Sequence, residues 1–326
     1  MLAYENCTLC PRGCSVNREA GQRGYCGETA ELRISVAGIH NGEEPPLKGE
    51  GGSGTIFLSG CNLGCAFCQC FQISHGRTLF EKKCIPREMS RAVDTVEFAE
   101  ICLALQNMGA ANINIVTGSH AAPLIAKGFE AARKRGLTIP ALWNSSGYDG
   151  VETLEILKDV VDVYMPDLKT LNPEFAAKFS NAPDYPEYAE SAILKMMEWK
   201  KPHFDSNGVM LSGVMIRHLI IPGYLENTRQ VLKWVAENCT GKNDNHALLS
   251  IMTQYTPAKI PGSKTEIPER LVSEDEYNAV LSMLDEFDIH DGFCQELVSE
   301  TIWLPDFNRH NPFPPGISVP VWHWAD

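Results

Sequence analysis

The chain has 326 residues, of which 44% are hydrophobic and 21% are charged. This composition excludes general disorder, and the length suits about two domains or one barrel-sized domain. The formal net charge of −13 excludes a protein that binds nucleic acid mainly by neutralising phosphates. Without a run of about 18 apolar residues, or a basic and apolar signal region in residues 1–10, the sequence predicts a cytoplasmic protein with no membrane partner.

Cysteine is the one abnormally frequent residue type, with twelve in the chain. Because a reducing cytosol disfavours disulfides in a chain of this length, metal ligation is the leading explanation. Seven cysteines fall into two close groups: Cys7, Cys10, Cys14 and Cys26, and then Cys61, Cys65 and Cys68. The scattered ones are expected to be small buried hydrophobic residues: Cys70, Cys84, Cys102, Cys239 and Cys294.

Residues 1–50 are rich in cysteine, glycine and turn formers and have no long periodic segment. They are expected to form a small lobe that is shaped by a metal rather than by a hydrophobic core. Four thiolates suffice for a zinc ion or for an iron–sulfur cluster. Cys7, Cys10 and Cys14 lie within eight residues and Cys26 is remote. This spacing favours an iron–sulfur cluster, with zinc as the alternative.

Residues 51–295 alternate short apolar runs with amphipathic stretches. Six runs are predicted strands: 55–59, 112–117, 139–143, 160–165, 214–221 and 248–252. Six longer segments are predicted helices: 93–108, 121–135, 151–158, 188–200, 225–237 and 273–287. The last opens with Ser273 and Glu276 in the spacing of a capping box. The alternation implies a parallel α/β sheet, either doubly wound or an incomplete barrel, and periodicity does not separate the two.

Residues 296–326 are rich in proline and large aromatic residues. They are expected to form a tail that packs on the barrel. Its anchors would be Trp303, Phe313, Trp322 and Trp324.

The segment Cys61-Asn62-Leu63-Gly64-Cys65-Ala66-Phe67-Cys68 directly follows the first predicted strand. Three thiolates on one short loop can hold three irons of a [4Fe–4S] cluster, which normally takes four protein ligands. Three close ligands without an evident fourth indicate an iron that is left open for a substrate or cofactor. Two alternatives remain: Cys70 is the fourth ligand, or the loop is a zinc knuckle.

The C-x3-C-x-aromatic-C pattern after a barrel strand resembles the signature of radical S-adenosylmethionine (SAM) enzymes. Over residues 1–295 the chain resembles the PflX-type radical SAM proteins, relatives of the pyruvate formate-lyase activating enzyme. Besides the cysteines, five segments carry this resemblance: GGSGTIF at 51–57, NINIVT at 112–117, NSSGY at 144–148, MPDLK at 165–169 and QYTP at 254–257. The resemblance implies an open, partial (β/α)6 TIM-like barrel with its site at the carboxyl ends of the strands.

In that superfamily SAM chelates the open iron through its amino and carboxylate groups, and the resemblance places Phe67 near the adenine. Thr117 and Ser119 are expected to accept hydrogen bonds from the SAM ammonium. Here the sequence departs from many relatives, because Gly118-Ser119-His120 replaces a Gly-Gly-Glu-like element. Asn144 and Ser145 are expected near the SAM carboxylate or ribose, with a simple polar turn as the alternative.

Met165, Asp167 and Lys169 point to the same side of a predicted strand end. In the activating-enzyme relatives, the residues that match Met165 and Asp167 help to bind a monovalent cation that contacts the SAM carboxylate. The resemblance therefore implies cofactor binding by Asp167 and Lys169, with a simple ion pair between them as the alternative. Arg217 resembles the arginine of an Arg-x-x-x-x-Pro-Gly stretch and is expected either to bind SAM or a substrate oxygen, or to form a structural ion pair.

The resemblance implies a radical SAM enzyme that uses a [4Fe–4S] cluster to cleave SAM to methionine and a 5′-deoxyadenosyl radical, which abstracts hydrogen from a protein or peptide substrate. The first expected partner is a glycyl radical enzyme, whose glycine Cα–H would be attacked. The expected reductant is a flavodoxin- or ferredoxin-type electron donor. Two rivals are modification of another peptide or a small metabolite, and a non-catalytic iron–sulfur electron-transfer or scaffold protein.

Overall fold

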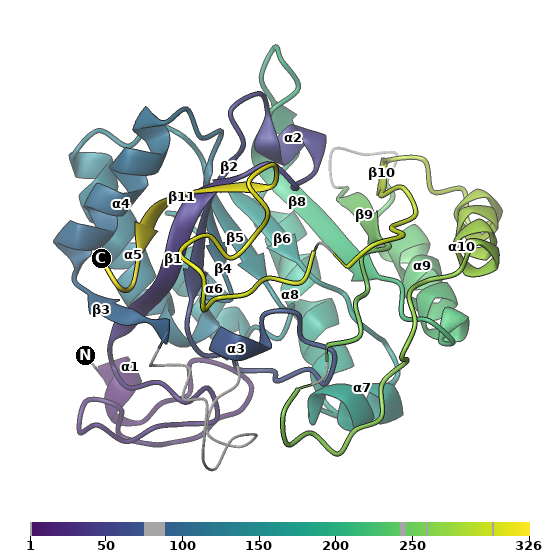
Figure 1. The fold of residues 1–326 in the computed structure, drawn as a ribbon, viewed down its shortest axis with the longest axis horizontal. Helices are drawn as coiled ribbons and strands as arrows, with labels where there is room; N and C mark the ends of the chain where they lie inside the picture. Colours follow the sequence, from purple (N-terminus) through teal and green to yellow (C-terminus); the bar gives the residue numbers. More distant parts are fainter. Residues whose placement is uncertain (1, 75–88, 242–245, 259, 302) are drawn as a thin grey trace.

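The computed structural model describes residues 2–74, 89–241, 246–258, 260–301 and 303–326 (Figure 1). Cys84, one of the predicted buried cysteines, lies outside the described residues. The described strands form one sheet in the order β10-β9-β8-β6-β5-β4-β2-β1-β11, with β3 paired to β1 and β7 paired to β8. The strands are β1 (Leu32–His40), β2 (Ser53–Leu58), β3 (Arg91–Val93), β4 (Ile113–Val116), β5 (Ala141–Ser145), β6 (Val163–Pro166), β7 (His203–Phe204), β8 (Met210–Leu219), β9 (Leu248–Met252), β10 (Gly292–Cys294) and β11 (Ser318–His323).

The central part of the sheet is parallel and follows the chain in order. Each neighbouring pair from β2 to β10 along the sheet is parallel. A doubly wound sheet reverses its strand order at a switch point, whereas this order runs without reversal, as in a barrel. The six predicted strands are confirmed, with ends that shift by a few residues, and β10 is a further parallel strand that the sequence did not predict.

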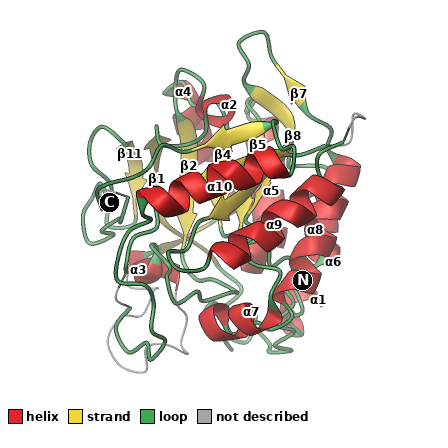
Figure 2. Cartoon of the chain, turned by 90° about the vertical axis from the view of Figure 1, so that its right-hand side faces the viewer, coloured by secondary structure: helices red, strands yellow, loops and turns green. Residues whose placement is uncertain are grey.

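Helices pack against the outer face of this curved sheet. The longer ones are α4 (Thr95–Asn107), α5 (Ala122–Lys134), α6 (Val151–Leu157), α7 (Pro173–Ser180), α8 (Tyr185–Trp199), α9 (Leu225–Asn238) and α10 (Glu274–Glu286). Figure 2 shows α8, α9 and α10 in a row in front of the strands. The short ones are α1 (Leu2–Glu5), α2 (Pro45–Lys48), α3 (Phe71–Ser74) and the 3-10 helix η2 (Ser119–Ala121). All six predicted helices are present, whereas α7 was not predicted.

Local sequence accounts for the starts of α4, α7 and α10, which have side-chain caps. Both hydrogen bonds of the capping box between Ser273 and Glu276 are present at the start of α10. In α4 the predicted stripe of Phe98, Ile101 and Leu105 is buried. Met108, predicted to continue that stripe, is 52% exposed, because the helix ends one residue earlier and leaves Met108 as its C-cap.

Two segments join the sheet from outside the predicted barrel. Residues 32–40, assigned by sequence to the amino-terminal lobe, form β1, which pairs antiparallel with β2, β3 and β11. Gly38 interrupts the apolar pattern of β1 because β11 passes close to it; a Cβ there would lie 2.6 Å from the Val319 carbonyl oxygen. In the tail, Phe307 and Phe313 pack on Phe57 of β2, with ring centroids 5.6 Å apart in each pair.

The inner face of the barrel changes character along its length. Leu142, Val163 and Met215 form a buried apolar cluster that Leu47 of α2 covers. Towards the carboxyl ends of the same strands, Asn144, Asp167 and Arg217 replace these apolar side chains. In the described part of the chain, no helix is long and apolar enough to span a lipid bilayer.

Candidate functional site

The three thiols of the Cys61–Cys68 loop are gathered at the carboxyl end of β2. Each has a separate hydrogen-bond partner: Leu63 N for Cys61 (3.3 Å), Ser180 Oγ for Cys65 (3.4 Å) and Ser74 Oγ for Cys68 (3.1 Å). Burial raises the pKa of the Cys65 and Cys68 thiols. Hydrogen bonds to sulfur are the means by which proteins stabilise cluster thiolates and tune their reduction potential. The donor set therefore fits an iron–sulfur cluster.

Neighbouring elements hold this loop in place. The Ala66 amide donates to the Phe179 carbonyl at 2.7 Å, and Asn62 Nδ2 donates to the Tyr148 carbonyl at 2.6 Å. Phe67, predicted beside the adenine, is 5% exposed and packs against Phe179 and Tyr255, with centroid distances of 6.0 and 6.4 Å. The loop is thus supported by α7 and by the segment after β9.

At the ends of β4 and β5, the predicted SAM contacts meet a residue that the sequence did not single out. Asp149 is 1% exposed and accepts a hydrogen bond from Ser119 Oγ at 2.5 Å. Burial raises the pKa of Asp149, while hydrogen bonds with Ser119 and Ser145 oppose that rise. Both serine hydroxyls therefore interact with Asp149. Asp149 lies in the polar segment that follows β5, and that polarity was the only sequence signal for it.

Thr117 has a strained backbone beside these serines. Its φ of 59° places a β-branched residue in the left-handed region. Its amide donates to the Asn144 carbonyl at 2.8 Å, which fixes the ends of β4 and β5 to each other. Such strain gathers at ligand-binding positions, and both Thr117 and Asn144 are only half-buried.

At the end of β6, Asp167 and Lys169 form the ion pair that was the alternative to cofactor binding. Lys169 Nζ lies 2.6 Å from Asp167 Oδ2, and the two side chains are 19% and 22% exposed. Burial disfavours the lysine charge, but Asp167 outweighs it and raises the pKa of Lys169 above its ordinary value. Tyr185 Oη supports this turn by donating to the Asp167 carbonyl at 2.8 Å and accepting from the Lys169 amide at 3.0 Å.

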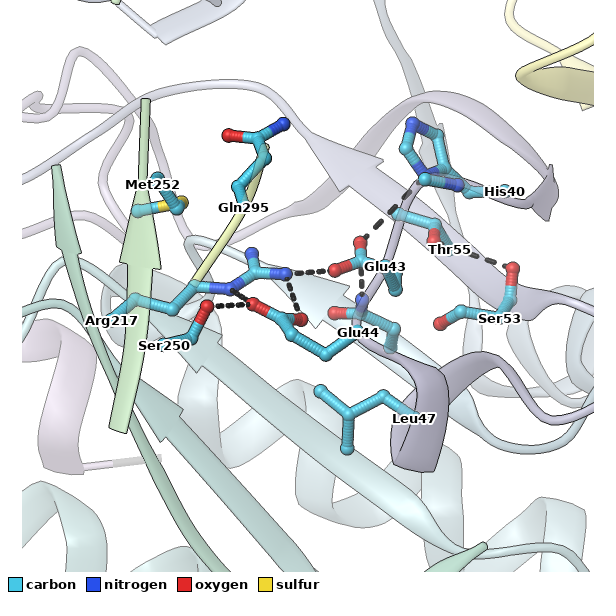
Figure 3. A network of polar contacts seen from close by, with 12 residues as sticks. His40, Glu43, Glu44, Leu47, Ser53, Thr55, Arg217, Ser250, Met252 and Gln295 are labelled. Atoms are coloured by element: carbon cyan, nitrogen blue, oxygen red, sulfur yellow. Dashed lines mark hydrogen bonds and ion pairs between the residues drawn. The ribbon is translucent and has the colours of Figure 1, made fainter. Parts of the chain in front are cut away.

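Arg217 lies in a buried ionic network inside the barrel (Figure 3). It pairs with Glu43 and with Glu44, at 2.9 and 2.6 Å to the Glu44 oxygens. Ser250 Oγ donates to Glu44 Oε1 at 2.6 Å, and Asn114 Nδ2 donates to Glu43 Oε1 at 3.1 Å. The structural ion pair expected as one role of Arg217 is therefore present.

The sequence did not reveal the acidic partners of Arg217. Glu43 and Glu44 lie directly before Pro45 and Pro46, and this Glu-Glu-Pro-Pro stretch was the available signal. Burial opposes ionisation of Glu44, but the adjacent Arg217 lowers its pKa below the ordinary value. Glu44 therefore keeps its negative charge inside the barrel, opposite a guanidinium that keeps its positive one.

Two sulfurs of the amino-terminal cysteine set, those of Cys7 and Cys14, receive an N–H donor. Arg18 Nη1 lies 3.6 Å from Cys7 Sγ, and the Tyr25 amide donates to Cys14 Sγ at 3.3 Å. Burial raises the pKa of Cys10 to about 12 and that of Cys26 to about 11. Four thiols in one lobe, two of them buried and two half-buried, fit a group bound through thiolates.

Arg18 organises the same lobe from within. It is 1% exposed and donates to the carbonyls of Glu28, Thr29 and His120 at 3.2, 2.6 and 2.6 Å. His120 belongs to η2 of the barrel, so Arg18 also fastens the lobe to the end of β4. Burial and the nearby Arg18 charge lower the pKa of His120 to about 3, which keeps its imidazole neutral.

Sulfur spacing bears on the choice between zinc and a cluster. A single tetrahedral zinc ion with Zn–S bonds of about 2.3 Å needs sulfur atoms about 3.8 Å apart. Among the described His, Cys, Asp and Glu residues, the group of three whose ligand atoms all lie within 4.8 Å is His310, His323 and Asp326. No three sulfur atoms of either described cysteine set lie within 4.8 Å of one another.

The scattered cysteines lie outside both sets. Cys102 and Cys239 are fully buried, as predicted. Cys294 and Cys70 are half-buried. Cys70 packs beside an apolar cluster that includes Ile73 and Phe307. It is close enough for its charge to interact with that of Cys61.

Comparison with known proteins bears on this site. Residues 55–235, more than half of the chain, match the family described as "Radical SAM superfamily". A relative from Methanocaldococcus jannaschii, "Uncharacterized protein MJ0674", is 31% identical over 277 residues, which cover 83% of this chain and 72% of the relative. Among solved structures, methylornithine synthase (PylB) is similar, with 12% identity, coverage of 79% of this chain and 78% of that chain, and a TM-score of 0.48.

Proposed function

Because the chain belongs to the radical SAM superfamily, we propose that it is an enzyme in which Cys61, Cys65 and Cys68 hold a [4Fe–4S] cluster that cleaves SAM. The chemistry that such a cluster supplies is one-electron reduction of SAM, giving methionine and a 5′-deoxyadenosyl radical that abstracts hydrogen from the substrate. One observation carries the proposal. Three thiols with separate hydrogen-bond partners, two of them buried and that of Cys68 half-buried, lie on one loop at the carboxyl end of the first parallel strand.

The neighbouring strand ends supply the groups that we assign to SAM binding. Phe67 would flank the adenine, and the half-buried Thr117 and Asn144 would meet the polar groups of the amino acid or ribose. Asp167 and Lys169 would orient the charged tail of SAM, with Asp167 also a ligand for a monovalent cation. Ser119 and Ser145 would contribute through lone pairs that remain after their contacts with Asp149.

We propose a protein or peptide as the substrate. The first candidate is a glycyl radical enzyme, which would lose hydrogen from a glycine Cα–H. The basis is the resemblance of the quoted segments to the activating enzymes. The polar inner face formed by Arg217, Glu43 and Glu44 gives the barrel donors and acceptors for a peptide backbone. We assign residues 51–295 to the catalytic barrel and, of residues 1–50, the part before β1 to a metal-binding lobe, because β1 and α2 join the barrel.

For the amino-terminal set we propose an iron–sulfur cluster rather than zinc. The support is the sequence spacing, with Cys7, Cys10 and Cys14 within eight residues and Cys26 remote, together with the N–H donors at Cys7 and Cys14. A flavodoxin- or ferredoxin-type protein would deliver the electrons, since a redox-active lobe on the barrel offers such a donor an entry point.

The test is anaerobic reconstitution with iron and sulfide, addition of SAM and dithionite, and measurement of 5′-deoxyadenosine. The wild-type protein should form it, and Cys61→Ala, Cys65→Ala or Cys68→Ala should reduce it to background. Cys70→Ala is the matched control, a cysteine two residues beyond the loop, and should retain formation. A protein that binds iron yet leaves SAM intact would instead be a non-catalytic electron carrier or scaffold.

A further inference from the structure

The amino-terminal lobe touches the Cys61–Cys68 loop through the Arg12 side chain. Arg12 Nε donates to the Asn62 carbonyl at 2.8 Å, and its Nη2 donates to the Leu63 carbonyl at 2.9 Å. The same guanidinium reaches the carboxyl end of α7, with donations to Asn181 and Ser180 carbonyls at 2.6 and 3.1 Å. Since Arg12 lies between Cys10 and Cys14 in the sequence, its side chain connects the amino-terminal cysteine set to the Cys61–Cys68 loop.

Tyr25 makes a second and shorter connection. Its amide donates to Cys14 Sγ at 3.3 Å, and its hydroxyl donates to the Leu63 carbonyl at 3.2 Å. The Leu63 amide in turn donates to Cys61 Sγ at 3.3 Å. A continuous hydrogen-bonded path therefore runs from a sulfur of one set to a sulfur of the other through Tyr25 and Leu63.

This path is tightly packed. The Arg12 guanidinium carbon lies 3.8 Å from the centroid of the Tyr25 ring and 5.2 Å from that of Tyr148. Gly64 has a φ of 76°, and a Cβ there would lie 2.9 Å from the Tyr25 hydroxyl oxygen. A glycine is needed at this position so that the tyrosine can reach the loop.

We propose that Tyr25, held by Arg12, is the electronic contact between an amino-terminal cluster and the SAM-binding cluster; this rests on the proposed function. A one-electron protein donor of the flavodoxin or ferredoxin class is oxidised, and the amino-terminal site takes up its electron. That electron passes to the Cys61 site, which is reduced by one electron. No bond or proton changes, and Tyr25 stays in its closed-shell form as the medium between the two sites.

Arg12 has a second effect on this transfer. Two thiolate-bound sites are both negative, and each added electron increases their mutual repulsion. A guanidinium between them, stacked on Tyr25, offsets part of that repulsion. Both sites can then hold electrons at the same time.

The experiment compares Tyr25→Phe with Tyr148→Phe in the anaerobic, iron-loaded protein. Both substitutions remove a hydroxyl from a ring beside Arg12. The Tyr25 hydroxyl bonds Leu63, whereas the Tyr148 hydroxyl donates to Asp184 Oδ1 at 2.8 Å. Each protein is mixed with reduced flavodoxin, freeze-quenched, and followed by EPR, with SAM present to mark the signal of the Cys61 site.

In Tyr25→Phe, the SAM-responsive signal should appear several-fold more slowly than in the wild-type protein, while the other signal appears at the wild-type rate. Tyr148→Phe should match the wild-type protein in both signals. The dipolar part of the spin–spin splitting in the fully reduced proteins depends on the distance and relative orientation of the two sites and should be the same in all three. A merely structural tyrosine would change the splitting or the iron content instead.

An unchanged rate in Tyr25→Phe, with both sites iron-loaded, overturns this contact and leaves the proposed function intact. Zinc in the amino-terminal site overturns the contact together with the second cluster. Absence of any SAM-responsive signal in the wild-type protein overturns the proposed function itself.

Discussion

The barrel and the amino-terminal lobe are held together by different forces. The barrel has a large core of fully buried apolar side chains between sheet and helices, with Trp143 and Phe129 among its members. The lobe has a small apolar cluster around Tyr4, Cys7 and Leu9. Its remaining order comes from hydrogen bonds to carbonyls and to sulfur. We infer that the barrel folds by hydrophobic burial, whereas the lobe depends on the metal that its thiols bind.

The largest effect should follow from the double variant Cys10→Ala/Cys14→Ala. Without two of its four thiols the lobe should lose its metal and its order, while the barrel stays folded. About four irons should then remain per chain, if both sites hold four-iron clusters. Hydrogen–deuterium exchange should show full exchange in residues 3–30 and protection in β4 and β5.

The functional counterpart of this variant separates the two regions further. SAM cleavage driven by dithionite should persist in part, since a small reductant can reach the Cys61 site directly. Turnover that depends on a protein donor should fall more. Loss of exchange protection in the barrel strands would contradict the inference that the barrel folds independently of the metal in the lobe.

The second largest effect is expected for the variant Arg18→Met. Arg18 satisfies two carbonyls and one sulfur inside the lobe and the His120 carbonyl of the barrel, so its removal should destabilise the lobe by about 3 kcal/mol. The readout is the opening free energy of lobe amides in native-state hydrogen exchange. Arg23→Met, at a half-buried arginine of the same lobe, is the matched control. An equal loss of opening free energy in both variants would show that Arg18 stabilises the lobe no more than Arg23 does.

In the barrel, Asp167→Ala should weaken SAM binding by about 1–3 kcal/mol, the size expected for a buried charged contact. Iron content should not change, because Asp167 contacts no thiol of the loop. Isothermal titration with SAM and iron analysis measure the two quantities. Unchanged affinity in a folded, iron-loaded variant would reduce Asp167 to the ion-pair partner of Lys169.

The smallest effect concerns Glu276 at the start of α10. Hydrogen bonds from Arg270 lower its pKa from 4.5 to about 2. A carboxyl whose pKa is lower in the folded state stabilises it above pH 4.5, and that stabilisation is lost as pH falls towards 2. Glu276→Gln should cost about 1 kcal/mol at neutral pH, with a difference from the wild-type protein that shrinks below pH 4.5.

This difference is measured by urea unfolding of the metal-free protein, followed by tryptophan fluorescence. Buried Trp143 reports on the barrel. A difference that stays constant between pH 6 and pH 3 would show that the Glu276 charge is not responsible.

The sequence predicted local features of the molecule and missed contacts between residues that are distant along the chain. The parallel strands were predictable because their apolar runs are local, and the cysteine loop because its ligands are close in sequence. Strand β1 was missed because it lies within a segment rich in cysteine, glycine and turn formers, although Leu32, Ile34 and Val36 alternate with polar residues. The ionic network was missed because Glu43 and Arg217 lie 174 residues apart, so no local pattern joins them. The contact of Tyr25 with Leu63 is likewise a product of the fold.

The most direct test of the account is iron analysis combined with EPR of the reduced, anaerobically prepared protein, with and without SAM. We expect about eight irons per chain and two EPR signals from the reduced protein. One, from the open site of three thiols, changes when SAM is added, and the other, from the closed site of four thiols, does not. About four irons with one zinc ion per chain, or two signals that both ignore SAM, would contradict the account.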